Sequence, residues 1–276
     1  MLLQFRRPKI VRQDGTNSIH VVYYDNDTRA AKYALFTATN TDPAEQPWVN
    51  LDGGDDAEDT QVVTNGGRST AAGEYVSVQL DEAGRPVVAY YDITNSTLKL
   101  ARATTATPTT AADWRLQGVF LPDDPNRTFV GTYVDMKIDS AGNIHLVAYR
   151  GSTGALVYLY AADVDGDTDY VFDYSVVVDS EGAVGAWADL SLDESGATAI
   201  PYVSYLNGSA LGTFDGLKLA HYDPIAATWE HEIVPVTSAV INDRTSVEYQ
   251  TGAVSWEVAI GYKSTSFDIV RMLPEE

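Results

Sequence analysis

Residues 73–92 read GEYVSVQLDEAGRPVVAYYD, residues 131–150 read GTYVDMKIDSAGNIHLVAYR, and residues 185–205 read GAWADLSLDESGATAIPYVSY. Their alignment matches Asp81 with Asp139 and Asp193. The steps between these aspartates are 58 residues (139 minus 81) and 54 residues (193 minus 139). A step of this size corresponds to one supersecondary unit, so the sequence indicates an array of repeats.

Two further copies extend the array to both ends of the chain. Residues 13–25 read QDGTNSIHVVYYD, and residues 244–264 read RTSVEYQTGAVSWEVAIGYKS, aligned so that Tyr249 matches Tyr133. Each copy contains short runs rich in β-branched and aromatic residues, bounded by Asp, Gly, Asn and Ser, which predict strands joined by hairpins. Four antiparallel strands per copy, with no helical period, predict an all-β fold: a five-bladed β-propeller.

The copies predict a single β-propeller domain spanning 1–276, with blades over about 8–64, 68–122, 127–179, 182–235 and 240–276. The last copy ends after its third strand. The N-terminal residues 1–7 precede the first blade's inner strand, so we expect them to supply the missing strand. That pairing closes the ring and covers strand edges that would otherwise be exposed.

The repeat pattern is an aromatic inner strand, an L-D-x-x-G turn, a strand ending in Y-Y-D, and an L-K-x-A strand. It resembles the blades of secreted bacterial β-propeller repeat proteins of the lectin-like or interaction-module type. The resemblance implies a location outside the cytoplasm, in the periplasm or at the cell surface, and a glycan or protein partner. WD40, kelch and Asp-box signatures do not occur in this sequence.

Charge and composition exclude several functions. The chain has 39 acidic and 18 basic residues, a formal net charge of -21 and no cysteine. This field repels nucleic-acid backbones and anionic lipid, and it favours cationic partners and metal ions. No apolar run reaches the length of about 18 residues that a membrane span requires, so membrane insertion is not expected.

Motifs for nucleophilic catalysis do not occur: the sequence has no cysteine, no G-x-S-x-G and no H-E-x-x-H. His20 and His145 occupy the same position in two copies, and Val87 occupies it in a third. A residue that recurs with the blade period is better explained by packing than by chemistry.

Two carboxylates are the candidate catalytic residues. Asp135 and Asp189 each follow the aligned inner-strand aromatic by two residues, so both point the same way in neighbouring blades. Glycoside cleavage uses two carboxyl groups about 5 to 9.5 Å apart. The alternative is that both aspartates bind solvent or a cation at the channel.

A second candidate site combines the inner-strand aromatics with arginines that precede them. Functionally, guanidinium groups at one repeat position form a cationic ring for an acidic sugar or side chain, with the aromatics beside it. The alternative is that each arginine pairs with an aspartate of its own linker. The candidate ligand-binding residues are Arg68, Tyr75, Arg127, Tyr133, Trp187, Arg244 and Tyr249.

Residues 163–169 suggest a calcium site, because four carboxylates alternate along one loop. Hard oxygen ligands at this density suit Ca²⁺, although the spacing is not that of an EF-hand. The alternative is a solvated acidic loop. The candidate metal ligands are Asp163, Asp165, Asp167 and Asp169.

Two functions remain open. The preferred one is a non-catalytic binding or interaction module that presents loops to a glycan or protein partner, which argues against an enzyme. The second is a glycan-cleaving enzyme that uses Asp135 and Asp189. Fold-level analogy does not decide between them.

Overall fold

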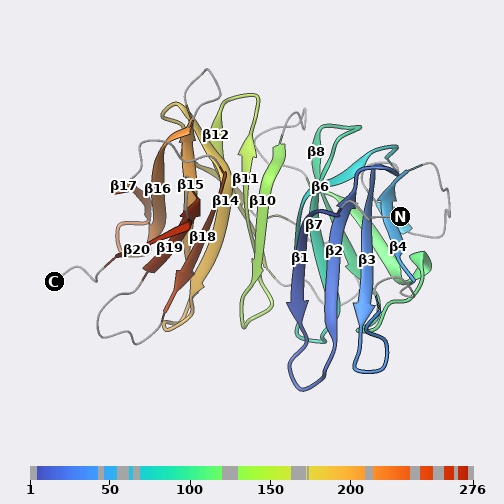
Figure 1. The fold of residues 1–276 in the computed structure, drawn as a ribbon. Helices are drawn as coiled ribbons and strands as arrows, with labels where there is room; N and C mark the ends of the chain where they lie inside the picture. Colours follow the sequence, from blue (N-terminus) through green and yellow to red (C-terminus); the bar gives the residue numbers. More distant parts are fainter. Residues whose placement is uncertain are drawn as a thin grey trace. The chain divides into compact units, whose positions relative to one another are not determined.

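A computed structural model describes residues 5–42, 47–54, 62–64, 69–119, 130–162, 172, 174–208, 214–236, 243–250, 258–263 and 267–272. Their secondary structure consists of strands and one short 3-10 helix, η1 (Ala111–Asp113). The strands form five sheets (Figure 1). In the described ranges no helix is long and apolar enough to cross a membrane. The chain divides into two compact units, residues 1–132 with 161–172 and residues 133–160 with 173–276.

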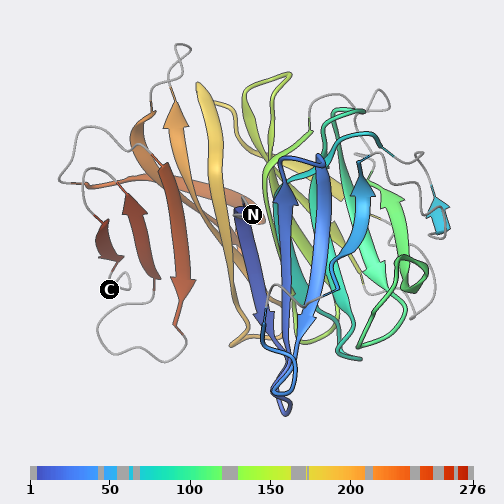
Figure 2. The ribbon, with the colours of Figure 1, turned by 45° about the vertical axis from the view of Figure 1, so that its right-hand side comes forward.

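The first unit contains two sheets. The first sheet is antiparallel, in the order β1 (Phe5–Arg12), β2 (Ile19–Asp25), β3 (Ala30–Phe36) and β4 (Val49–Gly53), whose strands lie side by side in blue in Figure 2. The second sheet is built from β6 (Ala72–Leu80), β7 (Pro86–Asp92), β8 (Thr97–Ala103) and β9 (Trp114–Gly118). A short fifth strand, β5 (Val62–Thr64), pairs in parallel with β9.

The second unit contains nearly all of the third sheet and the whole of the other two. The third sheet comprises β10 (Val130–Ile138), β11 (Ile144–Arg150), β12 (Ala155–Ala161) and β13 (Tyr174–Asp179). The fourth comprises β14 (Ala183–Asp193), β15 (Ile200–Gly208), β16 (Phe214–Asp223) and β17 (Thr228–Val234). The fifth has three described strands, β18 (Asp243–Tyr249), β19 (Val258–Lys263) and β20 (Phe267–Met272).

The predicted D-x-x-G turns join the first two strands of the second and third sheets. The Oδ1 atom of Asp81 accepts the backbone N–H groups of Ala83 (3.0 Å) and Arg85 (2.8 Å). Gly84 closes this turn with a φ of 73°, a value that a side chain disfavours. Asp139 makes the same contacts to its own turn. The turn chemistry inferred from sequence is therefore present.

The all-β fold of antiparallel, mostly four-stranded sheets is confirmed. Closure of the last blade stays a prediction, because residues 1–4 and 273–276 lie outside the described residues. Phe5 pairs with Asp25 of β2, so β1 begins in the first sheet. The proposed single-domain boundaries likewise stay a prediction.

The fifth copy is offset from the alignment made on sequence. The Leu190 N–H on β14 bonds to Asp135 of β10, and the Val247 N–H on β18 bonds to Asp189 of β14. By this register Val247 corresponds to Leu190, so Ser246 corresponds to Asp189. Counting back two residues, Arg244 and not Tyr249 corresponds to Trp187. The last copy has diverged from the repeat pattern, so too few of its residues align to determine this offset from sequence.

Candidate functional site

The inner strands carry a repeated backbone distortion beside their aromatic residues. Tyr75, Tyr133 and Trp187 have φ values of 57°, 55° and 57°, in the left-handed region that bulky residues rarely adopt. The pairing registers of β6 and β14 are interrupted at these points, as in β-bulges. Such strain is costly and often marks a functional position.

A glycine two residues earlier allows each inner strand to approach a neighbouring strand closely. A Cβ added to Gly73 would lie 2.6 Å from the Cα of Ala31, and one added to Gly185 would lie 2.9 Å from the Cα of Leu156. Both glycines have positive φ values. The glycine and the bulge together fix where the following aromatic and aspartate side chains lie.

Asp135 and Asp189 lie on neighbouring inner strands of the second unit. Asp135 on β10 is 4% exposed, and its Oδ2 accepts the Leu190 N–H at 3.1 Å. Asp189 on β14 is half-buried, and its Oδ2 accepts the Val247 N–H at 3.0 Å. Each carboxylate thus reaches the next inner strand along the chain. The sequence prediction that both side chains have equivalent orientations agrees with this pattern.

These amide contacts have two consequences. They tie β10 to β14 and β14 to β18, so both aspartates contribute to the structure. They also orient each carboxylate from a strand of the sheet, as a catalytic group requires. An aromatic pair accompanies them: the rings of Tyr133 and Trp187 have centroids 5.0 Å apart.

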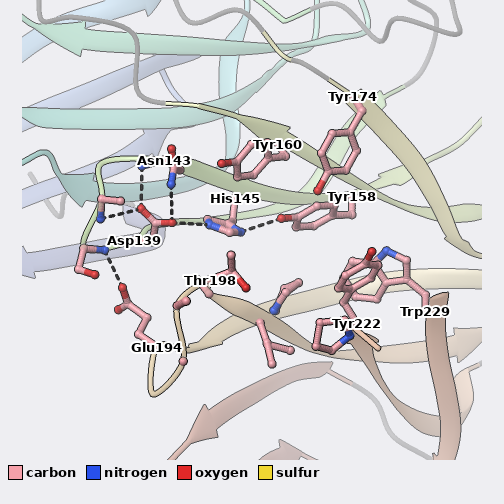
Figure 3. A pocket seen from close by; sticks show the side chains of 18 residues that line it. Asp139, Asn143, His145, Tyr158, Tyr160, Tyr174, Glu194, Thr198, Tyr222 and Trp229 are labelled. Carbon is pink, nitrogen blue, oxygen red and sulfur yellow. Dashed lines mark hydrogen bonds and ion pairs between the residues drawn. The ribbon is translucent and has the colours of Figure 1, made fainter. Parts of the chain in front are cut away.

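A cavity of about 320 Å³ lies in the second unit (Figure 3). Its carboxylates are Asp139 and Glu194, and its floor includes the segment from Gly196 to Pro201. The Oε1 atom of Glu194 accepts the N–H of Ser140 at 2.6 Å, which brings Glu194 next to Asp139 in the turn. The aromatic lining residues are Tyr158, Tyr160, Tyr174, Tyr222 and Trp229.

His145 links the acidic and aromatic parts of this cavity. Its Nε2 lies 3.2 Å from the Asp139 Oδ2, and its Nδ1 lies 2.7 Å from the Tyr158 hydroxyl. Burial lowers the pKa of His145, and the hydrogen bond to Asp139 opposes that effect only in part. The imidazole is therefore neutral at pH 7. Because a carboxylate only accepts, Nε2 donates to Asp139, and Nδ1 accepts from Tyr158.

The hydrogen bonds at Asp139 outweigh its burial. Burial raises the pKa of this carboxyl, but hydrogen bonds from Asn143 and His145 bring the pKa below its usual value. Burial raises the pKa of Tyr158 strongly, so the phenol keeps its proton. The network is thus a charged carboxylate, a neutral imidazole and a neutral phenol.

Buried lysine networks recur in both units but carry no open site. Lys99 Nζ lies 2.9 Å from Asp52 Oδ2 and 2.8 Å from Asp92 Oδ2, with all three side chains at most 1% exposed. In the second unit, Lys218 lies 2.7 Å from Asp179. Each lysine compensates buried carboxylate charge inside the protein, one carboxylate at Lys218 and part of the charge of two at Lys99, so we assign these networks to stability.

Several sequence candidates fall outside the described residues. Arg68 and Arg127 are among them, and so are all four candidate calcium ligands, Asp163, Asp165, Asp167 and Asp169. The backbone of Arg244 belongs to β18. The arginine ring and the calcium site stay predictions. Within the described ranges, no three acidic or histidine side chains group in a way that could hold a metal ion.

The aromatic candidates are only partly brought together. Tyr133 and Trp187 contact each other in the second unit, while Tyr75 lies in the first unit on β6. Tyr249 stacks on Tyr202, with centroids 4.9 Å apart and an interplanar angle of 27°. Its N–H donates to Ser191 Oγ at 3.0 Å.

No protein-family model and no curated protein sequence matches this chain. Solved structures do. A β-1,3-galactosidase of glycoside hydrolase family 43, solved with galactodeoxynojirimycin, gives a TM-score of 0.58 at 7% identity, over 97% of this chain and 90% of that chain. An α-L-arabinofuranosidase from Podospora anserina, in complex with cellotriose, gives a TM-score of 0.52 at 12% identity, over 99% of this chain and 86% of that chain. An exo-β-1,3-galactanase from Phanerochaete chrysosporium gives a TM-score of 0.53 at 9% identity, over 92% of this chain and 55% of that chain.

At such low identities the likeness shows the fold alone. It confirms the β-propeller class that the repeat predicted. It contradicts the preference for a non-catalytic binding module and against an enzyme, because these structures with the same fold are glycan-cleaving enzymes. That preference rests on the resemblance to lectin-like propellers and on the absence of local catalytic motifs. Two carboxylates on different strands form no local motif, so their chemistry leaves little trace in sequence.

The cavity around His145 was not found from sequence. Its residues come from two different copies, and the sequence of neither copy indicates that their side chains line one cavity. One feature could have indicated it: Tyr158 and Tyr160 alternate on the third strand of their copy. The corresponding pairs in the first, second and fourth copies are Tyr33 with Leu35, Leu100 with Arg102, and Leu219 with His221, so only the third copy has two tyrosines there. An aromatic pair on one face of a strand near a histidine is a usable indication of a pocket.

Proposed function

We propose that this chain is a glycan-cleaving enzyme whose reaction centre is built on Asp135 and Asp189. The observation that carries the proposal is the pair itself: two carboxylates at equivalent positions of neighbouring inner strands, each oriented by a backbone N–H. Glycoside hydrolysis requires two carboxyl groups held on rigid elements, one to protonate the leaving oxygen and one to act as nucleophile or base. The fold shared with glycan-cleaving enzymes supports the assignment.

The strained aromatic residues beside the carboxylates fit the same function. Tyr133 and Trp187 each precede an aspartate by two residues, and both have the positive φ values described above. Aromatic rings offer a large apolar face with a polar edge, which suits the faces of sugar rings. We assign these two rings to substrate positioning.

The test is turnover with amide substitutions. The protein is assayed for release of reducing sugar from β-1,3-galactan and arabinoxylan, and with nitrophenyl galactosides and arabinofuranosides. Asp135→Asn and Asp189→Asn each keep an oxygen that accepts the backbone N–H but remove the acid or base. We expect turnover to fall by about 100- to 10,000-fold in each variant.

The matched control is Glu248→Gln, which makes the same chemical change at an exposed carboxylate of β18. It should turn over substrate at the parental rate, and melting temperatures of all variants report whether the fold is intact. Stereochemistry of the product, followed by NMR, then distinguishes retention from inversion. A parent without turnover on the whole panel, or folded aspartate variants with undiminished turnover, would overturn the proposal.

A further inference from the structure

The cavity beside His145 has a distinctive combination of lining groups. Five aromatic side chains and two carboxylates face it, and among its described lining residues there is no lysine or arginine. In Figure 3 Asp139 and Glu194 lie at one end, Tyr222 and Trp229 at the other, and His145 between them. An anionic ligand would find no positive group there.

The charge of the cavity is negative at neutral pH. Asp139 is ionised because hydrogen bonds from Asn143 and His145 outweigh the effect of its burial. His145 is neutral and cannot compensate this charge. Glu194 adds a second, exposed carboxylate next to the first. The net charge of -21 on the whole chain further favours the approach of a cation.

The aromatic side chains form continuous walls. Tyr160 stacks on Tyr174 with centroids 5.4 Å apart and an interplanar angle of 22°. Trp229 contacts Tyr158 at 5.0 Å and Tyr222 at 5.9 Å. Ring faces carry partial negative charge and attract cations, most strongly where water is displaced.

We propose that this cavity is a binding site for a small organic cation with an alkylated ammonium group, of which choline is the simplest probe. Its methyl groups would contact the aromatic rings, and its charge would be balanced by Asp139 and Glu194. The volume is at the lower end of the range for ligand sites, which suits a ligand of this size. The site is separate from the carboxylate pair, so the proposal does not depend on glycan cleavage.

The experiment compares choline with dimethylbutanol, the neutral isostere in which carbon replaces the ammonium nitrogen. Binding to the full chain is measured by calorimetry and by NMR. We expect choline to bind with a Kd of about 1 mM. The neutral isostere should bind at least about tenfold more weakly, because it keeps the shape and loses the charge.

Two variants of exposed residues locate the site without disturbing the core. Glu194→Gln should weaken choline binding about threefold to tenfold, and Tyr174→Leu about threefold. Glu232→Gln, the same charge change at an exposed position on β17, should leave binding unchanged. Choline binding should also persist in Asp135→Asn, whatever the outcome for glycan turnover.

The proposal is overturned if choline does not bind at about 10 mM, or if the isostere binds equally well. It is also overturned if Glu194→Gln and Glu232→Gln have equal effects. Binding of a neutral disaccharide at this cavity in place of choline, located by NMR shifts at His145, would assign the cavity to sugars and sink the cation site.

Discussion

The first and third sheets contain the same histidine–tyrosine pair in different surroundings. His20 Nδ1 lies 2.8 Å from the Tyr33 hydroxyl, and His145 Nδ1 lies 2.7 Å from the Tyr158 hydroxyl. Both pairs join the second and third strands of their sheets across 13 residues. The repeat therefore specifies the pair, and packing explains its recurrence.

The two pairs differ at the other ring nitrogen. His145 Nε2 contacts Asp139 and the imidazole borders a cavity. His20 is fully buried, and its Nε2 has no hydrogen-bond partner among the described residues. The turn explains the difference: Gln13 N bonds to Ser18 O over five residues, whereas Asp139 N bonds to Asn143 O over four. The first turn is one residue longer and begins with glutamine, so a carboxylate is not placed below the histidine.

This comparison teaches that a repeat position has no fixed role. The same residue is a packing element in one sheet and part of a charged network in another, according to the turn that precedes it. The lysines show the same principle. Lys32, Lys99 and Lys218 occupy one repeat position, but Lys99 and Lys218 are buried whereas Lys32 is half-buried.

The largest expected effect concerns these lysines. Lys99→Met leaves two buried carboxylates, Asp52 and Asp92, without their cationic partner. It should lower the free energy of unfolding by about 4–5 kcal/mol. Lys218→Met removes the cationic partner of Asp179 alone and should lower the free energy of unfolding by about 3 kcal/mol. Urea denaturation at pH 7 measures both.

Lys32→Met is the matched control, because Lys32 lies 3.5 Å from Asp25 and both side chains are 17% exposed. Loss of a partly solvated pair of this kind should lower the free energy of unfolding by less than about 1 kcal/mol. Equal losses in the three variants would show that the repeat position, and not its surroundings, determines the effect.

The second effect is a pH dependence that separates the two histidines. Burial lowers the pKa of His20 from 6.5 to about 4. Between pH 6.5 and pH 4 the unfolded chain binds more protons than the native chain. The contribution of His20 to the free energy of unfolding is therefore fully present above pH 6.5 and is lost as the pH falls towards 4. From pH 7 to pH 5 the loss should be about 2 kcal/mol.

His20→Val places at this position the residue that the second sheet has at Val87, and it should remove that part of the acid sensitivity. His145→Val should change the pH dependence less, because Asp139 and Glu194 oppose the effect of burial on the His145 pKa. Unfolding curves at pH 7 and pH 5 test this order. A larger change for His145→Val would contradict it.

The sequence predicts the sheets well because each one is coded locally. Alternating β-branched and aromatic residues, with Asp and Gly at the turns, specify the hairpins of each copy. The strand β5 was not predictable in the same way. It pairs in parallel with β9, and a contact between segments so far apart leaves no periodic pattern in a run of three residues.

The candidate sites were predictable to different degrees. Asp135 and Asp189 follow from strand period and repeat alignment, because both are counted from an aligned aromatic. The cavity does not follow, since Glu194 and Trp229 come from the copy after that of His145. The recurrence of the histidine with the blade period predicts a packing role for His145. Its contact with Tyr158 recurs at His20, whereas its contact with Asp139 has no counterpart at His20 among the described residues.

The smallest expected effect removes only the phenol oxygens. In Tyr33→Phe, the imidazole of His20 loses the hydrogen-bond partner of its Nδ1 in a fully buried position, and the cost should be about 2 kcal/mol. In Tyr158→Phe, His145 keeps Asp139, and water in the adjoining cavity can replace the lost hydroxyl. The cost there should be about 1 kcal/mol or less.

Urea denaturation at pH 7 gives both values, and nitrogen NMR of the imidazoles reports the tautomers. His145 should keep its proton on Nε2 in Tyr158→Phe, because Asp139 continues to accept it. His20 has no such constraint among the described residues, so its tautomer should shift in Tyr33→Phe. Equal costs in the two variants, or a tautomer change at His145, would mean that Asp139 does not orient the third-sheet histidine, and the contrast between the two pairs would be lost.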